Sequence, residues 1–399
     1  MLFINAPELV QQVMVEQVAA FDKGFAIHNA LRPVVPNGLF SSEGDLHRHQ
    51  RKLIAPLFTP RQIAFYADTI TTYTEAWCTQ WTAGTITDIS QQMHQLTMSI
   101  IGKILFDVAD FSAEDDLGAA IQIALEHIIY AILHFLPVPL WWPTAQNRRT
   151  RPAIRLIHRR MQAMIENQRR GSGSPDTLLS LLIQAQDTEG TAMTDAQIRD
   201  EALTLFVAGH DTTANALAWC FSLLTTHPAV YSQVQQELDS VLQGRTPTYI
   251  DLPRLPYTLQ VIKETMRLYP PGWLLNRRSL CAQEVGGYQL AKGQLVMISI
   301  YTMHRRADYF PHPDQFDPAR FTPEREKQLP RHAYMPFGAG PRVCVGNHLA
   351  LMEAQLILAT VLQRMDLSQI PGQHVVPEAS MTLRQKQGCQ VRVQPRNGV

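Results

Sequence analysis

Cys344 is the side chain best suited to catalytic chemistry, because it lies in the glycine-rich run FGAGPRVCVG at residues 337–346. Glycines permit tight or left-handed turns and let the backbone approach a flat ligand closely. Arg342 places a positive charge beside the sulfur, which favours the thiolate. The pattern predicts a thiolate metal ligand directly before an apolar helix at residues 347–364. The three glycines around it are Gly338, Gly340 and Gly346.

A second reactive pattern is AGHDTT at residues 208–213, inside a long predicted helix. Gly209 in mid-helix costs roughly 1 kcal/mol relative to alanine, so we expect that something must approach it closely. Asp211 and Thr212 place an acid and an alcohol together, where the helix can be distorted and protons can be relayed. The alternative is a helix kink with a back-bonded threonine.

Two further patterns consist of charged side chains spaced by about one helical turn. Glu264 and Arg267 share one helix face, a spacing that is common and worth only about 0.2 to 0.5 kcal/mol when exposed. His47 and Arg51 are also one turn apart, near the start of a predicted helix, so both can reach the same ligand. A solvated basic face is the interpretation for Arg48 and Lys52, whose charges could also meet an acidic electron donor.

The elements that must position these residues are mainly helical, with strand-like segments late in the chain. We therefore predict a mainly α fold with a small β-sheet region beside a helical body. The predicted helices are 6–17, 60–83, 89–105, 113–135, 151–170, 175–186, 194–226, 227–243, 257–268 and 347–364. The predicted strands are 274–281, 287–290, 294–301, 381–385 and 390–393.

At 399 residues the chain could hold two or three average domains or one large one, and its 45% hydrophobic residues can bury a large core. The only linker-like stretch, 171–174, is too short to separate domains, so we expect one domain, residues 1–399. The 35 basic and 35 acidic residues balance, so we expect no nucleic-acid partner. The five scattered cysteines form no C-x-x-C pair, which indicates a reducing, cytoplasmic compartment. We expect no secretory signal and no transmembrane anchor, because the longest apolar run, 128–142, is short and contains prolines.

Together the four patterns resemble, in order and spacing, the cytochrome P450 family of haem-thiolate monooxygenases, in its soluble bacterial form. The resemblance covers nearly the whole chain from residue 5 onward. The thiol loop matches the family signature F-x-x-G-x-R-x-C-x-G at every specified position. The segment at 208–212 is similar to the family's oxygen-activating [AG]-G-x-[DE]-T.

The resemblance implies that Cys344 is the axial ligand of haem b, iron protoporphyrin IX, and that Asp211 and Thr212 guide protons during oxygen activation. It further implies a buried structural cluster of Glu264, Arg267 and Arg320, although Ala319 stands where the family usually has glutamate. The residues expected to contact the cofactor are His47, Arg51, Ala208, Gly209, Arg277, Phe337, Gly338, Arg342, Cys344 and Gly346.

The implied reaction is hydroxylation or epoxidation of a lipophilic small molecule with O2 and two electrons from a ferredoxin or flavodoxin and its reductase. Residues 135–142 are expected to form a lid, with ordinary core packing as the alternative. Two other functions stay open, a peroxide-driven peroxygenase and a non-catalytic haem-binding sensor or carrier. The predicted substrate pocket consists of Leu39, Leu205, Ala208, Trp273, Leu274, Met381 and Thr382.

The start of the chain departs from the family pattern. A proline-rich lead, a first helix and an opening strand normally precede the segment that resembles residues 3–13, and here they are absent. We therefore expect the N-terminal part of the small sheet to be shortened. A monomer is expected, and an unpaired sheet edge leaves strand-edge dimerisation open.

Overall fold

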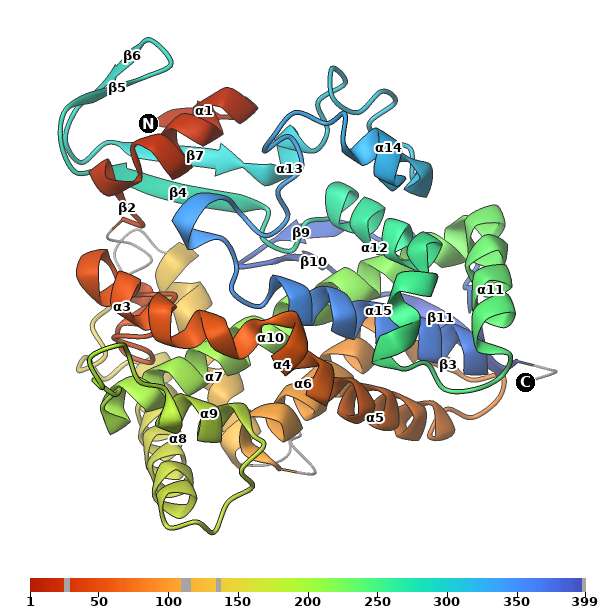
Figure 1. Ribbon diagram of the computed structural model, residues 1–399, viewed down its shortest axis with the longest axis horizontal. Helices are drawn as coiled ribbons and strands as arrows, with labels where there is room; N and C mark the ends of the chain where they lie inside the picture. The colour runs from red at the N-terminus through yellow and green to blue at the C-terminus, as the bar shows by residue number, and fades with distance from the viewer. Residues whose placement is uncertain (25–28, 109–115, 134–137, 397–399) are drawn as a thin grey trace. The chain divides into compact units, whose positions relative to one another are not determined.

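The structure is a computed structural model that describes residues 1–24, 29–108, 116–133 and 138–396 (Figure 1). It is mainly helical, as predicted. Its contacts group the chain into two compact units, which are treated separately here. The first unit contains Met1–Phe21, Ile63–Thr97 and Asp211–Val399, and the second contains Asp22–Gln62 and Met98–His210. Three helices, α4 (Pro60–Ile63), α6 (Ile89–Phe106) and α10 (Asp195–Thr226), contribute residues to both units.

The first unit contains every β-sheet of the described residues apart from an isolated bridge. Its strands are β1 (Leu2–Ile4), β2 (Phe21–Asp22, at the unit boundary), β3 (Ile86–Asp88), β4 (Leu274–Ser279), β5 (Gln283–Val285), β6 (Tyr288–Leu290), β7 (Leu295–Ser299), β8 (Met365–Gln369), β9 (Pro377–Ala379), β10 (Leu383–Gln385) and β11 (Gln390–Pro395). Its helices are α1 (Pro7–Gln11), α5 (Ala67–Thr79), α11 (Pro228–Leu242), α12 (Pro256–Leu268), α13 (Ile300–Met303), α14 (Pro323–Glu326) and α15 (Asn347–Arg364). The short η elements are η1 (Gln12–Glu16), η2 (Val18–Ala20), η4 (Ala64–Tyr66), η5 (Tyr249–Arg254), η6 (Pro318–Phe321) and η7 (Gly340–Arg342).

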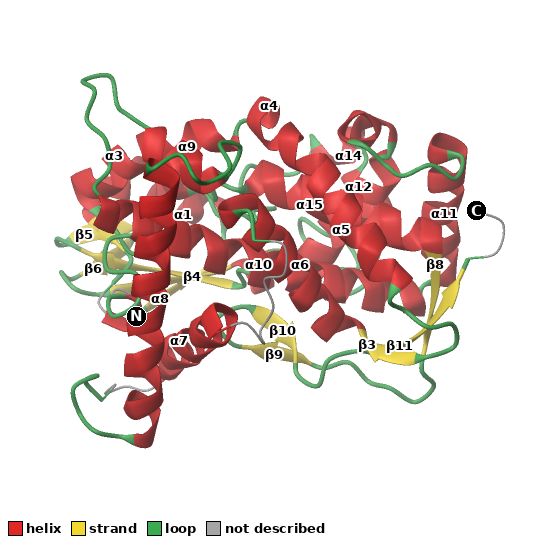
Figure 2. Cartoon of the chain, turned by 90° about the horizontal axis from the view of Figure 1, so that it is seen from below, coloured by secondary structure: helices red, strands yellow, loops and turns green. Residues whose placement is uncertain are grey.

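The second unit is helical. It contains α3 (Gly44–Ile54), η3 (Ala55–Phe58), α4 (Pro60–Ile63), α7 (Asp116–Leu133), α8 (Ala145–Arg169) and α9 (Leu178–Gln184). Helix α7 packs against the long helix α8 (Figure 2). Parts of two predictions lie outside the described residues, namely 113–115 and 134–135 of the helix expected at 113–135, and 135–137 of the expected lid.

The largest sheet has the strand order β1-β7-β4-β2, with β1 parallel to β7 and β4 antiparallel to it. Residues 2–4 thus supply an edge strand that the sequence pattern did not reveal, although it is only three residues long. Strand β7 and α1 lie close together in Figure 1, and their apolar faces form one core with the loop that precedes Cys344. Met335 and Ala339 belong to this core, so the sheet anchors the thiol loop.

Helix α15 passes through the middle of the first unit, packed against α5, α11 and α12 (Figure 1). Its residues are buried on nearly every side from Met352 to Gln363. A helix that is buried on nearly every side forms part of the core, so the segment after Cys344 is a rigid anchor for the loop.

Several predicted boundaries were wrong. Helix α8 begins at Ala145, before the predicted start at 151, because the Thr144 hydroxyl accepts a hydrogen bond from the Asn147 amide. Residues 300–301 are helical instead of extended, since the Ser299 hydroxyl accepts from the Thr302 amide. The helix predicted at 60–83 is divided into α4, the 3₁₀ turn η4 and α5. The single small sheet expected is four separate sheets.

Candidate active site

The loop around Cys344 uses two of its glycines in a backbone conformation that other residues rarely adopt. Gly338 and Gly340 have φ values of +76° and +67°, in the left-handed region that favours glycine. Gly346 has φ −90°, outside that region, and lies directly before α15. The Cys344 amide donates to the Phe337 carbonyl oxygen at 2.9 Å, which closes the loop on itself.

Gly340 also shows how closely this loop is pressed onto the N-terminal segment. A Cβ atom at this position would lie 2.0 Å from the carbonyl oxygen of Met14 in η1. At Gly338 a Cβ atom would meet only Leu275, at an ordinary 3.7 Å. Substitution of Gly340 would therefore displace the backbone that positions Cys344.

The cysteines differ sharply in their surroundings. Burial raises the pKa of the Cys78 and Cys220 thiols to about 12, and it also raises the pKa of the buried Cys389 thiol. Cys344 is exposed, and α15 begins three residues after it, so its sulfur lies near a helix N-terminus. Cys281 is the other exposed thiol, but no comparable glycine loop surrounds it. Among the described cysteines, Cys344 is thus an exposed thiol in a glycine-rich loop directly before a helix.

Two arginines belong to the same unit as the thiol. Arg277 lies on β4 and is 6% exposed, and its Nη1 atom donates to the Asn276 carbonyl oxygen at 2.8 Å. Arg342 ends η7 and is half-buried two residues before Cys344. A buried guanidinium retains its charge, so Arg277 is suited to bind an anionic group.

Helix α10 carries the predicted acid and alcohol, and it remains α-helical from Asp195 to Thr226 without the distortion that was expected. The close neighbour of Gly209 is Ile101 of α6, whose Cδ1 atom would lie 3.1 Å from an added Cβ atom. Packing against Ile101 thus gives a second reason for a small residue at this position, and the close approach of a bound ligand to Gly209 stays a prediction. Ala208, one residue earlier, is exposed.

Asp211 lies in a hydrogen-bonded cluster of the first unit. The Thr382 hydroxyl donates to Asp211 Oδ2 at 2.8 Å, and His94 Nε2 lies 3.3 Å from Oδ1. Asn215 Nδ2 donates to the Asp211 carbonyl oxygen at 2.8 Å and to Thr382 Oγ1 at 3.2 Å. Thr212 is half-buried beside Asp211. The sequence pattern identified Asp211 but gave no sign of His94.

Two predicted pocket segments of the first unit lie together. Trp273 Nε1 donates to the Ser380 carbonyl oxygen at 2.9 Å, which joins the start of β4 to the turn that carries Met381 and Thr382. Leu274 pairs with Ser299 at the end of β7 and is half-buried, as are Trp273 and Met381. The bond from Thr382 to Asp211 places this turn beside the acid.

The predicted pocket residues of the second unit are held by a buried acid. The Leu39 amide donates to Glu201 Oε2 at 2.9 Å, and Leu205 lies one turn after Glu201 on α10. Burial raises the pKa of Glu201 to about 8, so this carboxyl is largely neutral at pH 7. Leu39 and Leu205 are 8% and 7% exposed.

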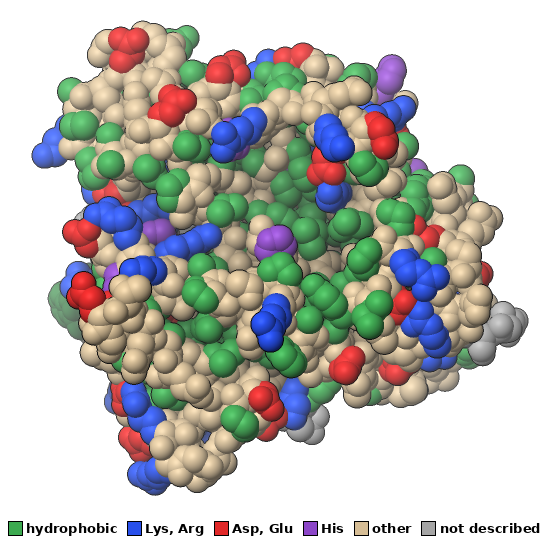
Figure 3. Space-filling view, in the orientation of Figure 1, with side chains coloured by type: hydrophobic (Ala, Val, Ile, Leu, Met, Phe, Trp, Pro, Cys, Tyr) green, Lys and Arg blue, Asp and Glu red, His purple; other side chains and the backbone are tan. Residues whose placement is uncertain are grey.

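Helix α3 separates the charged residues of its motif as expected. His47 is buried and Arg51 is half-buried, one turn apart. Arg48 is 71% exposed and pairs with Asp45, whereas Lys52 is exposed and donates to the Thr188 hydroxyl at 3.4 Å. Figure 3 shows basic side chains interspersed with acidic ones on the face in view.

The Glu264–Arg267 pair is completely buried, and every guanidinium donor has an acceptor. Arg267 Nε and Nη2 donate to Glu264 Oε2 and Oε1 at 2.6 and 2.7 Å. The remaining donors go to the carbonyl oxygens of His304, Pro313 and Gln315, at 2.9, 2.6 and 3.0 Å. These hydrogen bonds offset the free-energy cost of removing the two charges from water, which usually weakens a buried ion pair.

Arg320 joins the pair, as the sequence predicts. Its Nε atom lies 3.4 Å from Glu264 Oε1, and its Nη2 atom donates to the His312 carbonyl oxygen at 2.9 Å. The Asp317 amide also donates to Glu264 Oε1, at 2.9 Å. Burial raises the pKa of Glu264, although the hydrogen bonds and charge of Arg267 oppose that rise.

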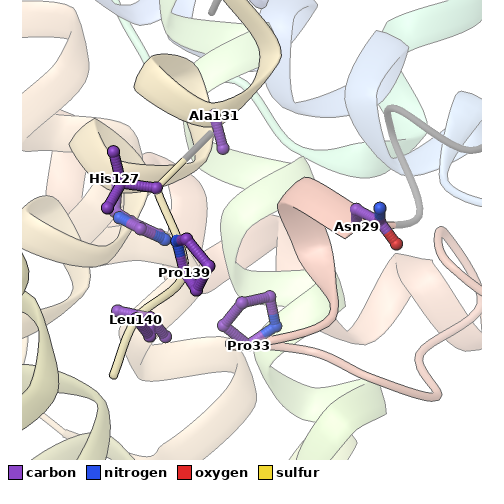
Figure 4. A pocket seen from close by; sticks show the side chains of 7 residues that line it. Asn29, Pro33, His127, Ala131, Pro139 and Leu140 are labelled. Atoms are coloured by element: carbon purple, nitrogen blue, oxygen red, sulfur yellow. The ribbon is translucent and has the colours of Figure 1, made fainter. Parts of the chain in front are cut away.

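A pocket of about 220 Å³ lies within the second unit (Figure 4). Its apolar lining comes from Pro33, Ala131, Val138, Pro139 and Leu140. The polar lining residues are Asn29 and His127, which lie on different sides of the pocket in Figure 4. Burial lowers the pKa of His127, and its Nδ1 atom has no hydrogen-bond partner among the described residues.

Comparison with known proteins agrees with this arrangement. The family model of cytochrome P450 matches residues 1–393. The chain belongs to the cytochrome P450 family. It is a cytochrome P450 monooxygenase, an oxidoreductase of the haem-thiolate type.

Similar P450s include two proteins of Streptomyces melanosporofaciens. Cyclooctatin synthase is 38% identical over 94% of this chain and 83% of its own length. Cyclooctat-9-en-7-ol 5-monooxygenase is 37% identical over 92% of this chain and 80% of its own length. Pentalenene oxygenase of Streptomyces avermitilis is 30% identical over 98% of this chain and 87% of its length.

Solved P450 structures share the fold. The haem domain of cytochrome P450DA superposes with a TM-score of 0.90 at 27% identity, covering 99% of this chain and 88% of that one. The retinoic acid-bound cyanobacterial CYP120A1 gives a TM-score of 0.89 at 25% identity, covering 99% and 89%.

The residues of this P450 fit a haem held by one protein thiolate. No group of three or more His, Cys, Asp or Glu side chains that could hold a metal ion occurs among the described residues. The exposed Cys344 in its glycine loop is the donor that a haem-thiolate cofactor needs. Within the part of the chain that the structure describes, no helix is both long and apolar enough to cross a bilayer.

Proposed function

We propose that this P450 hydroxylates or epoxidises a lipophilic isoprenoid, using O2 and two electrons from a separate ferredoxin or flavodoxin system. The observation that carries the haem chemistry is the exposed Cys344 thiol in a loop fixed by Gly338 and Gly340. Bound haem would supply the iron that binds and activates dioxygen. The protein's own residues would ligate the iron, bind the propionates, hold the substrate and guide protons.

The proposed ligand set follows the sequence prediction. Cys344 would ligate the haem iron, and Phe337, Gly338 and Gly346 of the same loop would contact the porphyrin. Arg277 and Arg342 bind propionates in the first unit, and their charge suits these carboxylates. His47 and Arg51 of the second unit are proposed as further propionate donors, and Ala208 and Gly209 as distal contacts, on the family pattern alone. Since the family match spans both units, residues 1–399 are proposed to act as one haem-binding domain.

The proposed cofactor is haem b, because the sequence contains no C-x-x-C pair for covalent haem attachment. The test is a difference spectrum of the reduced protein with carbon monoxide. A thiolate-ligated iron absorbs at distinctly longer wavelength than an imidazole-ligated one. The band must be present in the wild type and lost in Cys344→Ala, with Cys281→Ala as the matched control thiol. Its persistence in Cys344→Ala would refute the assignment.

Asp211 and Thr212 are proposed to guide protons to the distal side. Substitution Thr212→Ala should lower the product formed per electron consumed, and an unchanged yield would argue against the relay. Turnover with hydrogen peroxide at the rate of a reconstituted redox chain would favour the peroxygenase. A protein with a normal carbon monoxide band and no product from any tested compound would favour a sensor or carrier.

An isoprenoid substrate is supported by the relatives. The relatives at 38% and 37% identity are named cyclooctatin synthase and cyclooctat-9-en-7-ol 5-monooxygenase, and the second name specifies an alcohol as the substrate of that protein. The pocket of the second unit is apolar apart from Asn29 and a neutral imidazole at His127. An apolar skeleton with one hydroxyl would match this lining.

The substrate class can be tested by spectral titration with matched ligands. An isoprenoid alcohol should bind the wild type more tightly than the hydrocarbon that lacks its hydroxyl. Substitution His127→Leu should remove that difference while leaving hydrocarbon binding unchanged. Equal affinities of the wild type for both ligands would contradict a role for His127, and tighter binding of a straight-chain fatty acid would contradict the isoprenoid class.

The oligomeric state is proposed to be monomeric. The β1 edge of the largest sheet is only three residues long, and short edges pair poorly with other strands. Light scattering of the purified protein tests this proposal. A dimer that dissociates when Phe3, an exposed residue of β1, is replaced by lysine would instead indicate pairing through this edge.

A further inference from the structure

His94 is a chemically active side chain that the mechanism above does not use. It lies on α6, and its partner Asp211 is 117 residues away in the sequence. The Nε2 atom is 3.3 Å from Asp211 Oδ1, and each of the two side chains is 31% exposed. Water can therefore reach a pair whose acid belongs to the proposed proton relay.

The hydrogen-bond partners of His94 define where its protons lie. Nδ1 is 2.8 Å from the Ser90 carbonyl oxygen, which can only accept, so Nδ1 carries a proton. Nε2 faces a carboxyl oxygen, which also accepts when it is ionised. One additional proton must lie in this contact, either on the imidazole or on Asp211. The pair thus stores one exchangeable proton.

The charges around the pair favour the protonated imidazole. Burial lowers the pKa of His94, but the hydrogen bond and the negative charge of Asp211 outweigh it, so the pKa lies above its usual value. Arg384 of β10 opposes this rise, and Arg384 itself pairs with Glu378 at 2.7 Å. Thr382 holds the second oxygen of Asp211, which directs Oδ1 toward His94.

We propose that His94 is the proton donor that recharges Asp211, so that the relay runs from water through His94 and Asp211 toward Thr212. This inference rests on the proposed monooxygenase function and deepens it. The Nε2–H bond of His94 breaks as an O–H bond forms at Asp211 Oδ1, and this O–H bond breaks in turn when Asp211 passes the proton toward Thr212. The Nε2 lone pair then takes a proton from a hydronium ion, which leaves water. His94 acts through Asp211 and is a positioning and relay residue.

The first test measures protonation directly and does not depend on turnover. The side-chain nitrogens of His94 are titrated by NMR in ¹⁵N-histidine-labelled holoenzyme, with His94→Gln identifying the resonance. In Asp211→Asn the pKa of His94 must fall, because the charge that raises it is gone. An unchanged His94 titration in Asp211→Asn would overturn the proposal.

The second test compares pH profiles of product formed per electron consumed, with the substrate and redox system held constant. The yield of the wild type should fall as the pH rises through the pKa of His94. In His94→Gln the yield should not change with pH, and the rate should be lower by about tenfold. This decrease is smaller than the usual contribution of a general acid, because water can replace the imidazole in part. An unchanged profile in His94→Gln would overturn the proposal.

The matched control is His49→Gln, because His49 forms another histidine–aspartate contact, with Asp187 at 3.6 Å in the second unit. Its profile should equal that of the wild type. Failure of the proposed function is distinguishable, since the wild type would then lack the carbon monoxide band of a thiolate-ligated iron. A normal band with an unchanged His94→Gln profile refutes only the role of His94.

Discussion

Two acid–base pairs of the first unit, Glu264–Arg267 and His94–Asp211, differ in almost every physical respect. In the first, both side chains are 0% exposed and all five N–H donors of Arg267 have acceptors. In the second, both side chains are 31% exposed and a single 3.3 Å contact joins them. The first pair has no route for exchange with water, whereas the second has one.

The difference shows how one fold uses similar charges for opposite purposes. A buried pair with a complete set of hydrogen bonds fixes a single arrangement, because loss of either partner leaves an uncompensated charge in the core. A half-exposed pair can gain or lose a proton at little cost, because water compensates the change in charge. Stability measurements should therefore separate the two pairs clearly.

The largest effect is expected at the buried pair. Substitution Arg267→Ala should lower the free energy of unfolding by about 3 to 5 kcal/mol, because the buried Glu264 then loses both short hydrogen bonds to Arg267 and keeps the longer, 3.4 Å contact with Arg320. Denaturant unfolding of the purified protein measures the change. Lys263→Ala is the matched control, since the neighbouring Lys263–Glu326 pair is partly exposed and should contribute about 1 kcal/mol or less. Equal losses of unfolding free energy in the two variants would contradict the contrast between a buried and a partly exposed ion pair.

Glu353 is a buried acid without a neighbouring cation among the described residues, and its effect on stability can be measured. Burial raises its pKa to about 8 from an ordinary 4.5, with only the Thr213 hydroxyl opposing the rise. Between these values the folded protein keeps a proton that the unfolded chain has lost, so stability falls as the pH rises from 4.5 to 8.

Substitution Glu353→Gln should remove this pH dependence. At about 1.4 kcal/mol per pH unit, the wild type should lose roughly 3 kcal/mol relative to the variant between pH 5 and pH 7. Unfolding curves of both proteins across that range measure the difference. Parallel pH profiles would indicate that Glu353 is ionised in the folded protein.

The relay pair should contribute little to stability. Substitution His94→Gln should change the free energy of unfolding by about 1 kcal/mol or less at pH 7, because the pair is partly solvated. The raised pKa of His94 means that its contribution is present at low pH and is lost as the pH rises through that pKa. A loss as large as that of Arg267→Ala would make His94 a structural residue.

The smallest effect is expected on the surface of α3. Arg48 is 71% exposed and Asp45 is 93% exposed, so Arg48→Ala should change stability by less than about 0.5 kcal/mol. Thermal unfolding of the wild type and of Arg48→Ala in low and high salt measures this change in stability. A larger change would show that Arg48 has a role beyond a solvated charge.

Much of the architecture could be predicted from local sequence patterns. The helices at 194–226 and 347–364 were found nearly to the residue because each has a sustained apolar pattern bounded by clear signals. The strands β1, β2, β3, β5, β8 and β9 were not found. All of them except the five-residue β8 have only two or three residues, which carry no periodic signal. The start of α8 was misplaced because Pro152 looks like a first helical residue, although a threonine cap lies eight positions earlier.

The sequence by itself determined the chemistry of this protein. The reactive groups are neighbours within short segments: Cys344 with its glycines, Asp211 with Thr212, and Glu264 with Arg267. Residues so close along the chain stay close in space in any fold that keeps these segments intact. Only the tertiary structure decided which distant side chains complete them. His94 reaches Asp211, Thr382 orients Asp211 and Ile101 packs against Gly209, because packing brings together residues whose separation along the chain leaves no trace in a local pattern.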